Sequence, residues 1–166
     1  AFTVIVNHLR SLSGINDETA DGAGTAGGRV RAKRQAQAVS LANLIQSFQT
    51  ANSTEKIITL GDMNAFQVND GYADVIGTIK GTPAPDNTTV VPGDGADLVN
   101  PDLTDLVDNL TAAQRYSYSF DGNAQVLDHI LLNDDALAVL TRFAYARDDA
   151  DFPVKNYELA NELRLS

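Results

Sequence analysis

The sequence predicts one α/β domain in which helices pack on a mixed β-sheet. Two short apolar runs, at 2–9 and 56–60, flank a long helical pattern at 29–49, an alternation typical of α/β folds. Farther along, two strand-like runs are joined by Asp121-Gly122, a strong hairpin signal that indicates antiparallel strands. A chain of 166 residues with 43% apolar side chains is large enough to bury one core.

Apolar periodicity assigns the first half of the chain. Residues 2–9 are apolar on both faces, so we expect a buried central strand rather than an amphipathic one. Residues 13–28 are rich in glycine and predict a mobile surface loop, and 56–60 predict a second short buried strand. Between them, the helix at 29–49 carries one apolar stripe, made of Ala38, Leu41, Ala42, Ile45 and Phe48.

The second half contains more loop, because 81–102 holds four of the five prolines. The stretch 147–166 is acidic and irregular. The regular elements expected here are a short helix near 72–76, a helical turn at 103–110, and strands at 116–120, 123–132 and 137–145.

Composition excludes several classes of function. With 12 basic and 22 acidic side chains the net charge is −10, which argues against a broad basic face for nucleic acid. The negative net charge does not exclude an enzyme that contacts a single phosphate through a bound metal. No apolar run approaches the roughly 18 residues of a membrane span. The chain has no cysteine, which excludes disulfides, thiolate zinc sites and a cysteine nucleophile.

Four cations lie in the first turns of the predicted helix, where they oppose the helix macrodipole. They are Arg29, Arg31, Lys33 and Arg34. Two interpretations stay open at this point. The cations form a solvated charged face, or they attract a phosphate.

Polar residues follow the two predicted early strands. Asp62 and Asn64 lie two residues apart, so in extended backbone their side chains point the same way. A carboxylate suits Mg²⁺ and an amide can orient a water or a phosphate oxygen, although the same residues also favour a plain turn. His8 ends the first strand, either as a hydrogen-bonded structural residue or as a phosphate contact or proton donor.

Asp128 alternates with Val126, Ile130 and Leu132 in an otherwise apolar run, so we expect a buried carboxylate that needs a partner. Its useful partner is a histidine, which it would orient as in catalytic triads. The alternative is a satisfied structural aspartate. His129 points to the opposite face and is interpreted as structural.

Three short motifs follow one another along the chain: NHLRS at 7–11, LGDMNA at 60–65, and YSYSFDG at 116–122 leading to LDHIL at 127–131. Together they resemble the second half of the endonuclease/exonuclease/phosphatase superfamily, the DNase-I-like fold, and within it a branch of large secreted bacterial nucleases. Arg34-Gln35-Ala36 resembles a pattern of the same branch. The resemblance covers nearly the whole chain.

The resemblance implies an extracellular nuclease that hydrolyses phosphodiesters of DNA or RNA with a divalent metal, in a four-layer α/β sandwich. It implies that His8 contacts the scissile phosphate, that Asp62 helps hold the metal and the attacking water, and that Asn64 positions the phosphate and the water. Asp128 would orient a catalytic histidine. The implied metal residues are Asp62 and Asn64, with Mg²⁺ expected and Mn²⁺ or Ca²⁺ as alternatives.

The family pattern also has parts that this sequence lacks. Its first strands carry a metal-binding asparagine and a glutamate, and its last strand carries the catalytic histidine. We therefore expect residues 1–166 to be a partial domain of weak or no activity, with an unpaired sheet edge that favours self-association. Two other functions stay open: a phosphatase or phospholipase of the same superfamily, and a non-catalytic binding or surface module that retains the fold.

Overall fold

The computed structural model describes residues 1–20, 24–91, 95–120 and 122–147. The hairpin residue Asp121 and the acidic stretch from 148 onward lie outside the described residues. The elements, in chain order, are β1 Thr3–His8, α1 Ala26–Ala51, β2 Ile57–Asp62, α2 Val75–Lys80, η1 Asp86–Thr88, β3 Thr104–Asp105, η2 Leu106–Asn109, η3 Ala112–Gln114, β4 Tyr118–Phe120, β5 Asn123–Gln125, β6 Asp128–Leu132 and α3 Asp134–Leu137.

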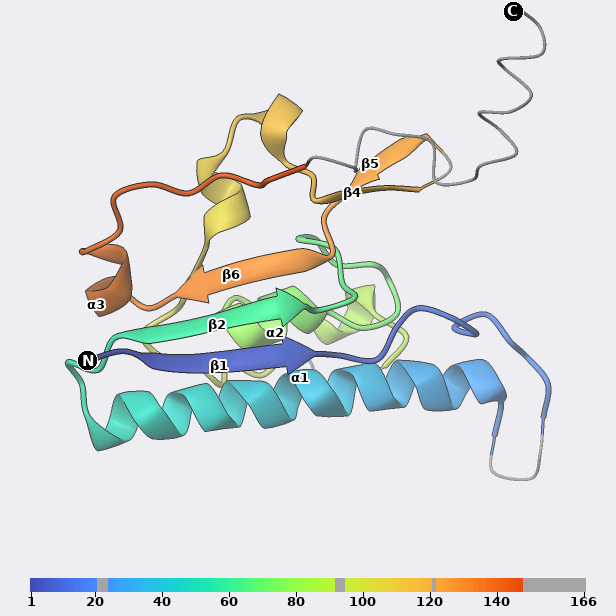
Figure 1. Cartoon of the computed structure of the whole chain (residues 1–166). Helices are drawn as coiled ribbons and strands as arrows, with labels where there is room; N and C mark the ends of the chain where they lie inside the picture. Colours follow the sequence, from blue (N-terminus) through green and yellow to red (C-terminus); the bar gives the residue numbers. More distant parts are fainter. Residues whose placement is uncertain (21–23, 92–94, 121, 148–166) are drawn as a thin grey trace, which may run out of the picture.

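Four strands form the central sheet, in the order β1-β2-β6-β3. β1 and β2 run parallel, whereas β6 is antiparallel to both β2 and β3. A parallel pair requires a crossover connection, and α1 supplies it along one face of the sheet (Figure 1). The hairpin β4–β5 forms a second, two-stranded sheet. The described part of the chain is therefore mixed α/β, as the sequence predicts.

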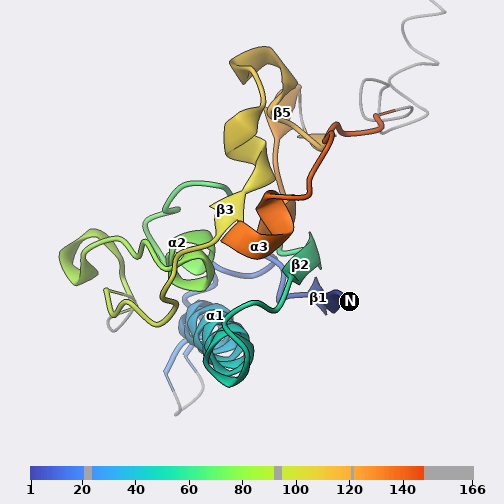
Figure 2. The same ribbon diagram turned by 90° about the vertical axis from the view of Figure 1, so that its left-hand side faces the viewer.

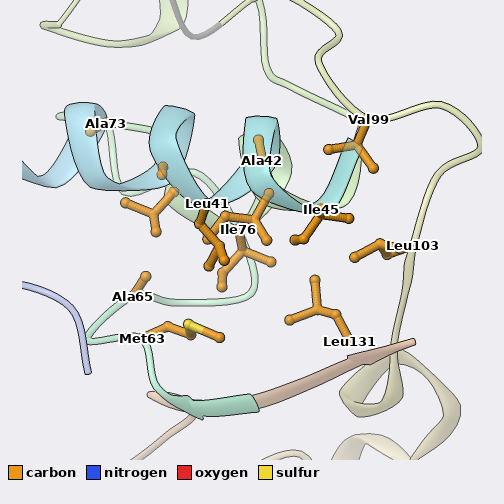
Figure 3. Packing of buried hydrophobic residues seen from close by; sticks show 13 residues of the cluster. Leu41, Ala42, Ile45, Met63, Ala65, Ala73, Ile76, Val99, Leu103 and Leu131 are labelled. Atoms are coloured by element: carbon orange, nitrogen blue, oxygen red, sulfur yellow. The ribbon is translucent and has the colours of Figure 1, made fainter. Parts of the chain in front are cut away.

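α1 covers the sheet with four of the five residues of the predicted apolar stripe, since Phe48 is only partly buried, and it begins earlier than its periodicity indicates. Thr25 caps it, because the side chain accepts a hydrogen bond from the backbone N–H of Gly28. The stripe packs with α2 and with residues of the sheet into the main core (Figure 3). The most buried members of this core are Ala38, Ala42, Ile45, Met63, Ile79, Val99 and Leu131.

The opposite face of the sheet is less covered. Figure 2 looks along the strands and shows α1 and α2 on one side, with α3 on the other. A smaller core of Leu106, Leu132 and Ala136 lies on this second side. Next to it runs an apolar groove of about 290 Å³, which includes Phe2, Leu60 and Phe143.

β1 is an edge strand, so the expectation of a buried central strand is wrong. Alternate residues of β1 face α1, and the others face the open side of the sheet. Val4 and Val6 are 53% and 74% exposed. The run is apolar on both faces, but burial depends on strand order, and β2 pairs with only one edge of β1.

Two later strand predictions are also corrected. The run 123–132 is two strands, because β5 pairs with β4 in the hairpin and β6 joins the central sheet. Residues 137–145 form no strand. Asn133 accepts a hydrogen bond from the Ala136 backbone N–H and caps the short helix α3, after which the described chain is irregular.

Two short helical elements expected from the sequence are present with shifted bounds. α2 begins later than the predicted helix at 72–76 because Asp74 is its N-cap. The turn at 103–110 contains β3 followed by η2. Among the described helices, none combines the length and the apolar character needed to cross a bilayer.

Candidate active site

Three of the four predicted site residues lie in one row across the central sheet. His8 is paired with Asp62 in the β1–β2 register, and Asp62 with Asp128 in the β2–β6 register. Opposite residues on neighbouring strands project from the same face, so the row occupies the face that α1 leaves uncovered. Neighbouring strands are about 4.8 Å apart, which places three polar side chains within roughly 10 Å.

Asp62 and Asn64 are joined by a turn rather than by extended backbone, which corrects the sequence prediction. Asn64 has a φ of 48°, the left-handed region that asparagine tolerates better than most residues. Its backbone N–H donates to Asp62 Oδ1 at 2.8 Å, and its side-chain amide donates to the Leu9 carbonyl at 3.1 Å. The turn therefore ties the end of β2 to the end of β1, directly beside His8.

His8 and Asp62 form the exposed half of the site. His8 Nε2 lies 3.6 Å from Asp62 Oδ2, with the two side chains 76% and 40% exposed. A groove of about 300 Å³ opens on the other side of His8 and is lined by Arg10, Ser11 and Lys33. Solvent and an anionic group can therefore reach His8 from a basic surface.

Asp128 is exposed, which corrects the expectation of a buried carboxylate. It is the first residue of β6 and lies on the face of the sheet that α1 leaves uncovered. Its Oδ2 accepts a hydrogen bond from the Ser117 hydroxyl at 2.9 Å, and its carbonyl accepts one from the Tyr145 hydroxyl at 2.5 Å. Burial raises the pKa of Tyr145, and the nearby carboxylates of Asp105 and Asp128 raise it further.

The donor set of the row fits a hard cation. Asp62 and Asp128 offer carboxylate oxygens, and Asn64 can add an amide oxygen because only its nitrogen is committed to Leu9. In the described part of the chain, no cluster of three or more acidic or histidine side chains has metal-binding geometry. Mg²⁺ commonly uses one or two carboxylates and keeps several waters, so this set suits Mg²⁺ better than zinc.

Two buried side chains, Arg34 and His129, lie behind the site, and the sequence did not indicate their contacts with it. Arg34 is 1% exposed, so it does not belong to a solvated charged face. Its Nη1 donates to the carbonyls of Arg10 and Asn64, and its Nη2 to Asp70 Oδ2 at 3.1 Å. Burial lowers the pKa of Arg34, and Asp70 opposes that shift. The signal for Arg34 is its position on the apolar stripe, four residues before Ala38.

His129 is the second of these residues and is also 1% exposed. The structural interpretation of its position, on the opposite face from Asp128, is confirmed by its burial. One of its hydrogen bonds joins it to Ala65, next to Asn64, and the sequence does not indicate this contact.

No protein-family model, curated protein or solved structure matches this chain. Function therefore has to be inferred from the row of side chains and its surroundings.

Proposed function

We propose that this chain belongs to a divalent-metal-dependent phosphodiesterase that acts on nucleic acid, within a DNase-I-like four-layer sandwich and in an extracellular setting. One observation carries the proposal: His8, Asp62 and Asp128 occupy consecutive positions of one row, with Asn64 held beside them. A row of two carboxylates, an imidazole and an amide on an open sheet face is suited to a phosphate and a hard cation.

Asp62 and Asn64 would hold the metal, and a bound divalent cation would neutralise phosphate charge and favour the deprotonation of water. Asp62 Oδ2 lies 3.6 Å from His8 Nε2, so this carboxylate would attract a protonated imidazole. His8 is exposed enough to donate to a phosphate oxygen. Asn64 uses its amide nitrogen on Leu9, which fixes the direction of its oxygen.

Asp128 supports the opposite end of the row. Its carboxylate is held by Ser117 and would orient a general acid–base group. The chain contains only two histidines, and neither can play that part: His8 lies two strands away and His129 faces the other side. We therefore expect weak turnover by the 166-residue chain, because its proton transfer relies on His8 alone.

The surface around His8 supports nucleic acid as the substrate. Arg10 and Lys33 line the groove next to the row, so a phosphate beyond the scissile one would meet positive charge. With a net charge of −10, we expect few such contacts in total. The dependence of binding on salt should then be shallow compared with that of a basic DNA-binding protein.

One observation favours a second candidate, a non-catalytic binding module. The Asp62–Asn64 turn satisfies its own hydrogen bonds, as a purely structural turn does. The two candidates differ in turnover and in metal dependence, and both can be measured on the same protein.

The test is nicking of supercoiled plasmid by the 166-residue chain with Mg²⁺ or Mn²⁺. We expect slow nicking that falls about 100-fold or more in Asp62→Asn, because a direct metal contact is lost. Asp134→Asn is the matched control, since Asp134 is an exposed carboxylate at the other end of β6. Mn²⁺ affinity, measured by electron paramagnetic resonance, should fall in Asp62→Asn and stay unchanged in the control.

The outcomes separate the candidates. Metal binding that depends on Asp62 but comes with no cleavage of plasmid or RNA would favour the binding module. Hydrolysis of a phosphate monoester or a lipid headgroup in place of plasmid would assign the phosphatase or phospholipase branch. Nicking that is equal in Asp62→Asn and the wild type would refute the proposed site.

A further inference from the structure

A buried histidine–carboxylate pair lies behind the turn that carries Asn64. His129 Nδ1 is 2.7 Å from Asp105 Oδ2, and the two side chains are 0% and 1% exposed. The second ring nitrogen, Nε2, is 2.9 Å from the carbonyl oxygen of Ala65. The pair therefore joins three separate segments: β6, the β3–η2 junction and the residue directly after Asn64.

The partners decide which ring nitrogen carries a proton. A carbonyl oxygen only accepts hydrogen bonds, so Nε2 of His129 must donate to Ala65. A proton is also shared between Nδ1 and Asp105, whichever of the two holds it. The other oxygen of Asp105 accepts from the Val107 backbone N–H at 3.2 Å, which fixes the carboxylate in place. The imidazole is consequently held in one orientation from both ends.

The bond to Ala65 is one of three that hold this turn from behind. The Met63 backbone N–H donates to the Leu127 carbonyl at 2.8 Å. Arg34 Nη1 donates to the Asn64 carbonyl at 2.6 Å. Successive peptide groups of the turn are thus each held by a group outside it. These bonds stabilise the left-handed backbone conformation of Asn64.

We propose that His129 is a positioning residue, which donates from Nε2 to Ala65, holds the 62–65 turn, and thereby sets the direction of Asn64 and Asp62. Its effect on turnover rests on the proposed function. Its effect on the turn does not, because the contacts of His129 lie within the protein. Asp105 acts one step farther back, by orienting the ring.

A matched pair of variants isolates the bond to Ala65. In His129→Gln the side-chain amide reaches the place of Nε2 and can still donate to Ala65. In His129→Asn the amide takes the place of Nδ1, so it can meet Asp105 but falls short of Ala65. Asp105→Asn is a third variant, because an amide can donate to Nδ1 of a neutral imidazole while its oxygen still accepts from Val107.

The first readout is hydrogen exchange at the backbone amides of Met63 and Asn64, measured by NMR. We expect these amides to exchange at least about tenfold faster in His129→Asn than in the wild type. The loss of one hydrogen bond to a buried carbonyl is large enough to raise the exchange rate by that factor. His129→Gln removes the partner of Asp105 but keeps the bond to Ala65, so exchange at these two amides should stay closer to the wild type than in His129→Asn, and so should exchange in Asp105→Asn. Asn133→Ala is the control for general destabilisation, because Asn133 is a buried polar residue that bridges β2 and β6 at their other end.

The second readout is Mn²⁺ affinity together with the separate kcat and KM for nicking. His129→Asn should weaken Mn²⁺ binding about 10-fold or more and lower kcat, whereas His129→Gln should keep both.

The outcomes separate the positioning role from the proposed function. Fast exchange in His129→Asn, combined with no nicking even by the wild type, would support the positioning role and reject the proposed function. A role confined to general stability predicts that Asn133→Ala opens the turn as much as His129→Asn, and that result would overturn the proposal. Equal damage in Asp105→Asn and His129→Asn, or unchanged exchange in His129→Asn, would overturn it as well.

Discussion

Replacement of Arg34 by methionine tests how the two loops of the site are held together. The guanidinium is buried and links the Arg10 carbonyl, the Asn64 carbonyl and the carboxylate of Asp70, which is itself 7% exposed. Methionine has a similar length but no charge and no donor. Arg34→Met therefore leaves a buried carboxylate without its cation and two carbonyls without a donor.

The size of the loss follows from these contacts. Removal of one partner of a buried ion pair costs about 3–5 kcal/mol. Asp70 also accepts from the backbone N–H groups of Tyr72 and Ala73, so its carboxylate keeps part of its stabilisation and the lower end of that range applies. With a smaller contribution from the two carbonyls, we expect a loss of about 3–4 kcal/mol in the free energy of unfolding. For a chain of this length, the melting temperature should fall by roughly 6–16 °C.

Urea unfolding of four proteins measures this loss and its origin. They are the wild type, Arg34→Met, Asp70→Asn and the double variant. We expect the double variant to be more stable than the sum of the single losses predicts, by about 1 kcal/mol or more, because both charges are then removed together. If Arg34→Met lowers the free energy of unfolding by less than about 1 kcal/mol, the pair behaves like an exposed ion pair. That result would refute a stabilising role for the buried Arg34–Asp70 pair.

Two further predictions concern Tyr145 and the free edge of β1. The pKa of the Tyr145 phenol is raised in the folded state, so its contribution to stability is complete below about pH 10 and is lost as the pH rises beyond that value. Urea unfolding between pH 8 and 11 should show a smaller alkaline loss in Tyr145→Phe than in the wild type, and equal slopes would contradict this. Val6 is 74% exposed on an edge strand, so we expect concentration-dependent self-association in sedimentation experiments, reduced by Val6→Lys. A wild type that stays monomeric at every concentration would contradict the prediction of self-association. Ala36→Lys, on the exposed side of α1, is the control and should leave association unchanged.

Much of the local structure was predictable from the sequence because its causes are local. The helix at 29–49, the strand at 56–60 and the hairpin near Gly122 depend on periodicity and turn chemistry within a few residues. Part of the error at 137–145 has a local cause, because Leu137 is the last residue of α3. Asn133 followed by two aspartates is a helix start, and the apolar run behind it concealed that signal.

The candidate site was predictable as a set of residues but not as an arrangement. In the sequence, His8, Asp62 and Asn64 are visible as polar residues that end or follow predicted strands, and Asp128 as a polar residue inside an apolar run. Their meeting depends on the register of two strand pairs that come from distant parts of the chain. The sequence also placed Asp128 in the wrong environment, because alternation along a strand shows that two residues face opposite sides but not which side is covered.

The sequence by itself determined the α/β class and the main helix with most of its apolar stripe, and it singled out the polar residues of the candidate site. All of these follow from interactions between near neighbours along the chain. Only the tertiary structure decided that β1 lies at an edge, that Arg34 is buried, and that His129 reaches Ala65. Each of those facts depends on which distant segment covers a given side chain, and burial of this kind is a property of the packed fold rather than of the local sequence.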